Sequence, residues 1–245
     1  QVHGIFVDHN DNLWISSERQ GDNHLLKFTK AGKFLLQIGH KGKSTGSNDT
    51  ENLNRAADMY VHPRTNELFV ADGYGNRRVI VFDAETGAYK RHWGAYGNKP
   101  DDTIKTTRAA QGDGAKTFSL VHHVTISNDD LVYVADRNNN RIQVFSLDGK
   151  FVKEAFVSRE TLSNGTVYSF AFSRDPQQQY LYVADVGNGR IRILNRQTLE
   201  PIAAIGRWGR QAGQFMVPHN IATDSKGNLY VAEIREGRIQ KFVLK

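Results

Sequence analysis

Cysteine is absent from the 245 residues of this chain, and so is any run of about 18 apolar residues. The first absence excludes disulfide bonds and thiolate metal ligands, and the second argues against a membrane-spanning helix. Helical periodicity is also missing, which leaves β-structure as the expected class. Lys and Arg form no block despite the formal net charge of +6. We therefore read that charge as solvated surface, and expect neither nucleic acid nor a membrane as a partner.

The start of the chain and its composition bear on its location. No signal peptide is visible, but Gln1-Val2-His3 already lies inside a repeated unit, so we expect a processed or truncated N-terminus. A chain without cysteine suits the cytosol, and equally a bacterial periplasm or the exterior. We expect an extracellular or periplasmic protein.

Five copies of one unit run through the sequence at a period of roughly 45 residues. Each copy is a series of short segments rich in Val, Ile, Tyr and Phe, separated by turn residues such as Asn-Asp and Asp-Gly-Lys. The second segments of the copies read LWISS, ELFVAD, LVYVAD, YLYVAD and NLYVAE. Four strands per copy at this period predict a single all-β domain over residues 1–245, a β-propeller of four-stranded blades.

The fifth copy ends after its third strand, whereas copies one to four carry a fourth. Propellers usually close by pairing strands from the two ends of the chain, because an open edge is costly. Either closure is unusual here or an N-terminal blade lies outside residues 1–245, and we expect six blades in the complete protein. An open ring could also close by oligomerising.

Two further features of the repeat predict local structure. Acids at the end of the second strand and arginines on the third predict turn-bracing contacts, namely of Asp72, Asp136 and Asp185 with Arg78, Arg141 and Arg190. The long connections 41–54 and 95–117 are expected at a functional face, where loops of such length commonly lie.

Histidine occupies one equivalent position in three copies. His3, His122 and His219 each open a short apolar strand, whereas copy two has Ala57-Asp58 there and copy four has Tyr168-Ser169. Repeats that close into a ring point equivalent positions at one axis, so three imidazoles from alternate blades would meet at one metal ion. A single histidine that opens a strand is more often a hydrogen-bonded structural residue, but the threefold recurrence favours metal binding.

The repeat resembles the NHL family of β-propellers over essentially the whole chain, and more narrowly the peptidyl-α-hydroxyglycine α-amidating lyases. The resemblance is carried by VHGIFVD, VADGYGNRRVIVF, FSLVHHVTIS, YVADRNNNRIQVF and FMVPHNIATD, in that order. The alternation of the histidines is similar to these lyases, in which three alternate blades each give one histidine to a catalytic zinc. The resemblance implies a Zn²⁺-dependent carbon–nitrogen lyase that cleaves the N–Cα bond of a peptide's C-terminal α-hydroxyglycine, giving a peptide amide and glyoxylate.

The resemblance also implies roles for individual residues. A tyrosine in the second-copy hairpin is the family's base, and Tyr74 occupies that place; an arginine in the third copy helps to hold the substrate carboxylate, and Arg137 occupies that place. A second arginine of the family lies upstream of the first histidine, beyond this sequence. The last histidine motif of the family has an aspartate that binds structural Ca²⁺, where Asn220 offers an oxygen without a charge. The expected Zn²⁺ ligands are His3, His122 and His219.

Two other functions are compatible with the repeat. One is a non-catalytic NHL propeller that binds protein, RNA or glycan on one face, which the net charge of +6 could assist. The other is a different propeller enzyme, such as a lactonase or a streptogramin-lyase-like protein. Such enzymes usually rely on acidic or mixed metal ligands, and no matching acidic set stands out in the sequence.

Overall fold

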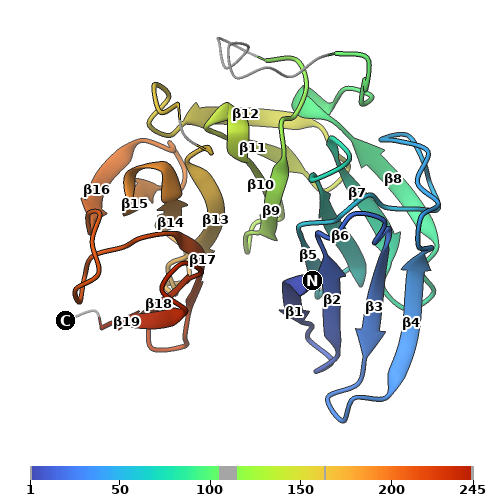
Figure 1. The fold of residues 1–245 in the computed structure, drawn as a ribbon, viewed down its shortest axis with the longest axis horizontal. Helices are drawn as coiled ribbons and strands as arrows, with labels where there is room; N and C mark the ends of the chain where they lie inside the picture. Colours follow the sequence, from blue (N-terminus) through green and yellow to red (C-terminus); the bar gives the residue numbers. More distant parts are fainter. Residues whose placement is uncertain (1, 105–114, 163, 244–245) are drawn as a thin grey trace.

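The computed structural model of the chain describes residues 2–104, 115–162 and 164–243. These residues form five antiparallel sheets, four of them with four strands and one with three. The sheets follow one another around a central axis as the blades of a propeller (Figure 1). The prediction of an all-β propeller with five recognisable blades is confirmed, and copy five contributes three strands within the described residues. Six blades in the complete protein stay a prediction.

Each blade is a meander in which consecutive strands pair. Blade 1 contains β1 (Val2–Val7), β2 (Leu13–Ser17), β3 (His24–Phe28) and β4 (Phe34–Gly39). Blade 2 contains β5 (Asp58–His62), β6 (Glu67–Asp72), β7 (Arg78–Asp83) and β8 (Tyr89–Trp93). Blade 3 contains β9 (Val121–Ile126), β10 (Leu131–Asp136), β11 (Arg141–Ser146) and β12 (Phe151–Phe156).

The last two blades lie on the C-terminal side of the arc (Figure 1). Blade 4 contains β13 (Val167–Phe172), β14 (Tyr180–Asp185), β15 (Arg190–Asn195) and β16 (Pro201–Ile205). Blade 5 contains β17 (Pro218–Thr223), β18 (Leu229–Glu233) and β19 (Arg238–Phe242). Among the described residues, short 3₁₀ turns accompany the strands at η1 (Ala95–Gly97), η3 (Arg137–Asn139) and η4 (Val186–Asn188). In the described ranges, no helix has the length and apolar character that crossing a bilayer requires.

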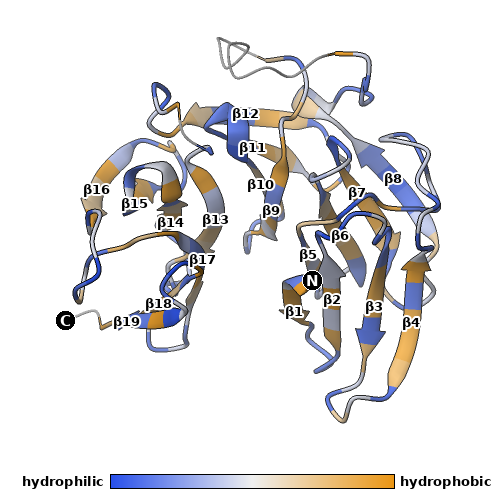
Figure 2. Cartoon of the chain, in the orientation of Figure 1, coloured by the Kyte–Doolittle hydropathy of each residue, from blue (hydrophilic) through white to orange (hydrophobic). Residues whose placement is uncertain are grey.

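Apolar side chains fill the spaces between consecutive blades. Every residue of β6 is buried, because blade 2 has a neighbour on each face. Phe69, Trp93 and Phe145 belong to the cluster between blades 2 and 3, and Trp14, Leu25 and Phe82 to the one between blades 1 and 2. These two inter-blade clusters hold the strands of blades 1, 2 and 3 side by side. The outermost strands differ in polarity, since β8 is largely hydrophilic and β4 largely hydrophobic (Figure 2).

The inner strands are packed in chain order, β1 against β5, β5 against β9, β9 against β13, and β13 against β17. In the described part of the chain, β1 and β17 do not pack against each other to this extent, although the His3 and His219 rings approach to 5.1 Å at the axis. Apolar side chains near this edge are exposed, including Ile5 at 60% and Ile239 at 71%. The ring of these five blades is therefore open between the first and the fifth.

A buried ion pair recurs at one end of the blades. The Arg78 guanidinium bonds the Asp72 carboxylate at 2.9 Å and Arg141 bonds Asp136 at 2.7 Å, with all four side chains fully buried. The acids also accept backbone N–H groups of the segment leading into the inner strand, from Asn54 to Asp72 (2.9 Å) and from Ser119 to Asp136 (2.7 Å). Each brace therefore ties a hairpin to the entry of its own blade.

The predicted brace of blade 4 is wrong in one partner. Asp185 bonds Arg192 at 2.9 Å, whereas Arg190 is exposed. Residues two apart on a strand share a face. Arg192, the third residue of β15, therefore reaches the acid of its own blade, as Arg78 and Arg141 do from the first residue of β7 and β11. In blade 5, Arg238 and Glu233 form the equivalent pair at 2.7 Å.

Removing one partner of a buried pair leaves an uncompensated charge. Arg141→Met is expected to lower the free energy of unfolding by about 3–5 kcal/mol. Arg190→Met, at an exposed position, is expected to change it by less than about 0.5 kcal/mol, and Arg192→Met by more than Arg190→Met. Urea unfolding measures all three. Equal effects of the changes at residues 190 and 192 would contradict the brace of blade 4.

Candidate metal centre

A β-bulge marks the start of the inner strand in all three histidine blades. In blade 3, Val121 pairs with Asp136 and His123 with Ala135, so His122 is one residue too many for its partner strand. In blade 5, His219 is extra between Pro218 and Asn220, and in blade 1 one extra residue lies between Val2 and Ile5. A bulge re-aims the inserted side chain. The displaced backbone therefore points these imidazoles at the axis and not into a blade interface.

The three histidines form a nearly equilateral cluster. The ring centroids of His3 and His122 are 5.0 Å apart, those of His3 and His219 5.1 Å, and those of His122 and His219 4.8 Å. One ligand atom from each ring lies within 4.8 Å of the others. Three residues from blades 1, 3 and 5, separated by about half the chain length, thus converge as the repeat predicts. Whether they bind a metal stays a prediction.

Two of the rings are oriented by backbone carbonyls of the next blade. Nδ1 of His3 lies 2.7 Å from the Ala57 carbonyl oxygen, and Nδ1 of His122 lies 2.7 Å from that of Tyr168. A carbonyl can only accept, so Nδ1 carries the proton in both rings, and Nε2 keeps a free lone pair when the ring is neutral. This is the outer hydrogen bond that commonly orients metal-binding histidines.

Tyr74 and Arg137 lie at the same cluster. The Tyr74 hydroxyl is 3.0 Å from Nε2 of His3 and 3.2 Å from Nε2 of His122. Nη1 of Arg137 donates to this hydroxyl at 3.5 Å, while Nε donates to the Asn164 carbonyl at 2.7 Å. The guanidinium also lies 4.1 Å from the ring centre of Tyr168. All five residues singled out in the sequence therefore share one site.

Burial sets the protonation of this site. Desolvation, followed by the neighbouring His219, holds the pKa of His122 well below its ordinary value. Desolvation and then the charge of His3 lower the pKa of His219 to about 3. Desolvation raises the pKa of Tyr74 to about 12, and Arg137 opposes that rise. The site thus favours the neutral imidazole, the form that binds metals, at His122 and His219, and a protonated phenol at Tyr74 in the absence of a further cation.

The donor set fits Zn²⁺. Three imidazole nitrogens are ligands that Zn²⁺ prefers, and three protein ligands leave a fourth position for water or substrate. The lone pairs of His3 and His122 both face the Tyr74 hydroxyl, so the open side of the cluster is the side on which Tyr74 and Arg137 lie.

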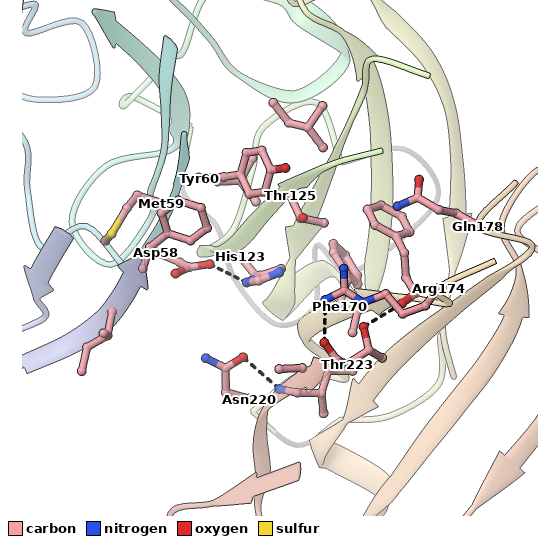
Figure 3. Close-up of a pocket in the computed structure, with 18 of the residues that line it drawn as sticks. Asp58, Met59, Tyr60, His123, Thr125, Phe170, Arg174, Gln178, Asn220 and Thr223 are labelled. Carbon is pink, nitrogen blue, oxygen red and sulfur yellow. Dashed lines mark hydrogen bonds and ion pairs between the residues drawn. The ribbon is translucent and has the colours of Figure 1, made fainter. Parts of the chain in front are cut away.

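The residues around Asn220 do not fit Ca²⁺. Its side-chain oxygen accepts the N–H of Ile221 at 2.8 Å. In the adjoining cavity of about 360 Å³, Asp58 is the only acid among the lining residues, and its carboxylate is bonded to Nδ1 of His123 at 2.5 Å (Figure 3). Ca²⁺ takes six to eight oxygen ligands, several of them charged. The described residues that line this cavity provide no such set.

Three contributions to the site escaped sequence reasoning. Tyr168 supplies the carbonyl that orients His122, and its ring packs 4.9 Å from that imidazole. Arg55 lies with its guanidinium carbon 5.4 Å from the centre of the Tyr74 ring, and it pairs with Glu18 at 3.6 Å. Arg55 lies two residues before Ala57, and the equivalent residue of blade 3, two residues before His122, is Leu120. A charged residue where the other copy has leucine was the signal in the sequence that could have pointed to Arg55.

Comparison with known proteins agrees with the repeat. The NHL repeat family profile matches residues 118–145, which contain His122, Arg137 and most of the blade 3 hairpin. The chain therefore contains a recognisable NHL repeat, and it folds as a β-propeller. Its relatives include NHL repeat-containing protein 3 of Homo sapiens, 27% identical over 98% of this chain. They also include the probable peptidyl-alpha-hydroxyglycine alpha-amidating lyase pgal-1 of Caenorhabditis elegans, 23% identical over 97% of this chain.

This chain spans only part of the length of these relatives: 66% of the human protein and 62% of the nematode one. Among solved structures, the virginiamycin B lyase of Staphylococcus aureus superposes with a TM-score of 0.63 at 14% sequence identity, covering 99% of this chain and 70% of that one. At such identity the likeness shows a shared fold and carries no argument about activity. The amidating-lyase resemblance therefore stands on the relatives by sequence and on the site.

The depressed pKa of His219 makes the metal-free protein sensitive to acid. The unfolded chain binds a proton at His219 below pH ~6.5, whereas the folded chain does so only near its pKa of about 3. The free energy of unfolding should therefore fall as the pH drops below 6.5, by at most about 1.4 kcal/mol per pH unit for each such histidine.

Urea unfolding at pH 7.5, 6.5 and 5.5 with a chelator measures this slope. His219→Asn should reduce it, and His9→Asn, at an exposed position, should leave it unchanged. An identical slope for the parent and His219→Asn would contradict the depressed pKa.

Proposed function

We propose that this propeller is a zinc-dependent lyase that cleaves the N–Cα bond of a peptidyl-α-hydroxyglycine, giving a peptide amide and glyoxylate. One observation carries the proposal: the Tyr74 hydroxyl lies 3.0 and 3.2 Å from the Nε2 atoms of two histidines in a three-histidine cluster. A purely structural cluster needs neither an Nε2 lone pair facing the axis on two imidazoles nor a phenol between them. The amidating-lyase relatives support the choice of substrate class.

The residues divide the chemistry between them. His3, His122 and His219 would hold Zn²⁺, which when bound polarises the substrate hydroxyl oxygen and lowers the pKa of that hydroxyl. Arg137 would pair with the carboxylate through its planar fork and so orient the substrate. Nε is bonded to the Asn164 carbonyl and Nη1 donates one proton to the Tyr74 hydroxyl, so Nη2 and the second Nη1 proton would make that contact.

Tyr74 is the proton carrier in this proposal. Its oxygen accepts the hydroxyl proton, the C–O bond becomes a carbonyl as the N–Cα bond breaks, and the same proton passes to the departing amide nitrogen. Because burial raises the pKa of Tyr74 to about 12, it acts as a base only when positive charge faces its oxygen. Arg137, 3.5 Å away, supplies part of that charge.

A non-catalytic binding propeller is the second candidate. NHL repeat-containing protein 3 matches this chain as well as the amidating enzymes do, and its name states no activity. A protein, RNA or glycan ligand would not require the neutral imidazole cluster, so metal content separates the two functions. For the lyase we expect a peptide or small-molecule substrate and an extracellular or periplasmic location.

The metal is tested first. Protein purified without a chelator should contain about one zinc ion per chain by mass spectrometry of the metal. His122→Ala should remove most of it, and His9→Ala should retain it. A parent protein that contains no zinc and takes up none on dialysis would rule out the proposal.

The reaction is tested with α-hydroxyhippurate and an assay for glyoxylate. Tyr74→Phe should lower kcat by about 10²–10⁴-fold with zinc retained, because it removes the proton carrier. Arg137→Met should mainly raise KM, because it removes the carboxylate contact. Tyr180→Phe, at an exposed tyrosine, is the matched control. No glyoxylate from the zinc-loaded parent would leave the binding propeller as the better proposal.

A further inference from the structure

Tyr74 projects from a tight loop, and its hydroxyl must stay within hydrogen-bond distance of two imidazoles. The loop runs from Asp72, at the end of β6, to Arg78, at the start of β7. Tyr74 is only partly buried, and a tyrosine on a hairpin turn can rotate about two side-chain bonds. Something outside the loop must therefore hold the ring in place.

The backbone of the loop is fixed from two sides. A Cβ atom at Gly73 would lie 2.0 Å from the Val121 carbonyl oxygen, so only glycine allows the loop to touch the strand that carries His122. On the other side, Gly75 donates its N–H to the Asn54 carbonyl at 2.9 Å, and Asn54 donates its own N–H to Asp72 at 2.9 Å. The connection from blade 1 to blade 2 thus grips the base of the loop.

Arg55, the next residue of this connection, reaches the ring itself. Its guanidinium carbon lies 5.4 Å from the centre of the Tyr74 ring, in the range of a cation–π contact. The guanidinium is anchored by Glu18, since Nε donates to the Glu18 carbonyl at 2.6 Å and Nη2 lies 3.6 Å from its carboxylate. The anchor comes from blade 1, the blade that also carries His3.

The backbone of Arg55 is unusual for its residue type. Its φ is +62°, in the left-handed region that non-glycine residues seldom adopt, and its N–H donates to the Asp22 carbonyl at 3.2 Å. Leu120, at the equivalent position before blade 3, has a φ of +71°, so the repeat itself sets this conformation. Before blade 2 the same backbone carries an arginine, and it directs the charged side chain toward Tyr74.

We infer that Arg55, anchored by Glu18, is a positioning residue that holds the Tyr74 ring so that its hydroxyl faces His3 and His122. Arg137 contacts the hydroxyl and Arg55 contacts the ring, so the two guanidinium groups fix different parts of one side chain. The positioning is independent of any activity, but its catalytic meaning rests on the proposed function.

The test separates these two levels. 3-Fluorotyrosine is placed at residue 74, and its ¹⁹F resonance is recorded in the metal-free parent, Arg55→Ala, Arg55→Lys and Glu18→Gln. Lys241→Ala is the matched control, because Lys241 lies 5.4 Å from the Tyr230 ring on the outer edge of blade 5. We expect Arg55→Ala to shift and broaden the resonance, Glu18→Gln to do so less, Arg55→Lys to restore part of it, and the control to leave it unchanged.

Kinetics on α-hydroxyhippurate with the zinc-loaded, unlabelled proteins give the second readout. Arg55→Ala should lower kcat about 10-fold or more with KM changed less than about 2-fold, because a misplaced group slows the chemical step more than binding. The kcat of Arg55→Lys should lie between that of the parent and that of Arg55→Ala.

An unchanged ¹⁹F resonance in Arg55→Ala overturns the inference, and so does a rise in KM alone, which would make Arg55 a substrate-binding residue. If no protein releases glyoxylate, the proposed function fails while the resonance still decides the positioning. If Arg55→Ala does not fold by circular dichroism, Arg55→Lys and Glu18→Gln carry the same comparison.

Discussion

The buried pair between an acid and an arginine is the interaction on which the rest of the structure depends. One position of the repeat faces the axis, and it is occupied by Ala57 in blade 2, His122 in blade 3 and His219 in blade 5. In these blades the acid also accepts the backbone N–H of the residue three positions earlier, which is Asn54, Ser119 or Met216. A charged group buried without a partner is strongly destabilising, so the pair is formed as a unit or not at all. Its second hydrogen bond places the chain for the residue that follows three positions later, which is His122 in blade 3, His219 in blade 5 and Ala57 in blade 2.

Odd and even blades contribute differently to the site. Blades 1, 3 and 5 present imidazoles, whereas blades 2 and 4 present the backbone carbonyls of Ala57 and Tyr168 that orient the rings of His3 and His122. A histidine in every blade would crowd the axis, where the centroids of the three imidazole rings already lie only 4.8 to 5.1 Å apart. The alternation that the sequence displays therefore has a physical basis, since each oriented ligand uses the neighbouring blade as its support.

The repeat predicts what is equivalent between blades and misses what is not. The strands, the five blades and the approach of His3, His122 and His219 follow from matching positions, and Tyr74 and Arg137 were carried by family resemblance. The Arg192 brace and the approach of Arg55 to Tyr74 join residues at non-equivalent positions, and the Asp58–His123 pair joins equivalent positions that carry different residue types. Such contacts depend on how far individual side chains reach within a blade or between blades, which a single sequence does not give.

The bulges have a consequence for how the ligand set could evolve. Asp58 pairs with Ala71 in an unbroken register, so an imidazole substituted for the adjacent Ala57 would start from regular strand backbone. In blade 4 the register already shifts between Val167 and Phe170, and Tyr168 packs 5.4 Å from His219. A tyrosine codon becomes a histidine codon by one base change. In blade 4, a further imidazole ligand could therefore arise by a single mutation at Tyr168. In blade 2, a residue would first have to be inserted to form the bulge.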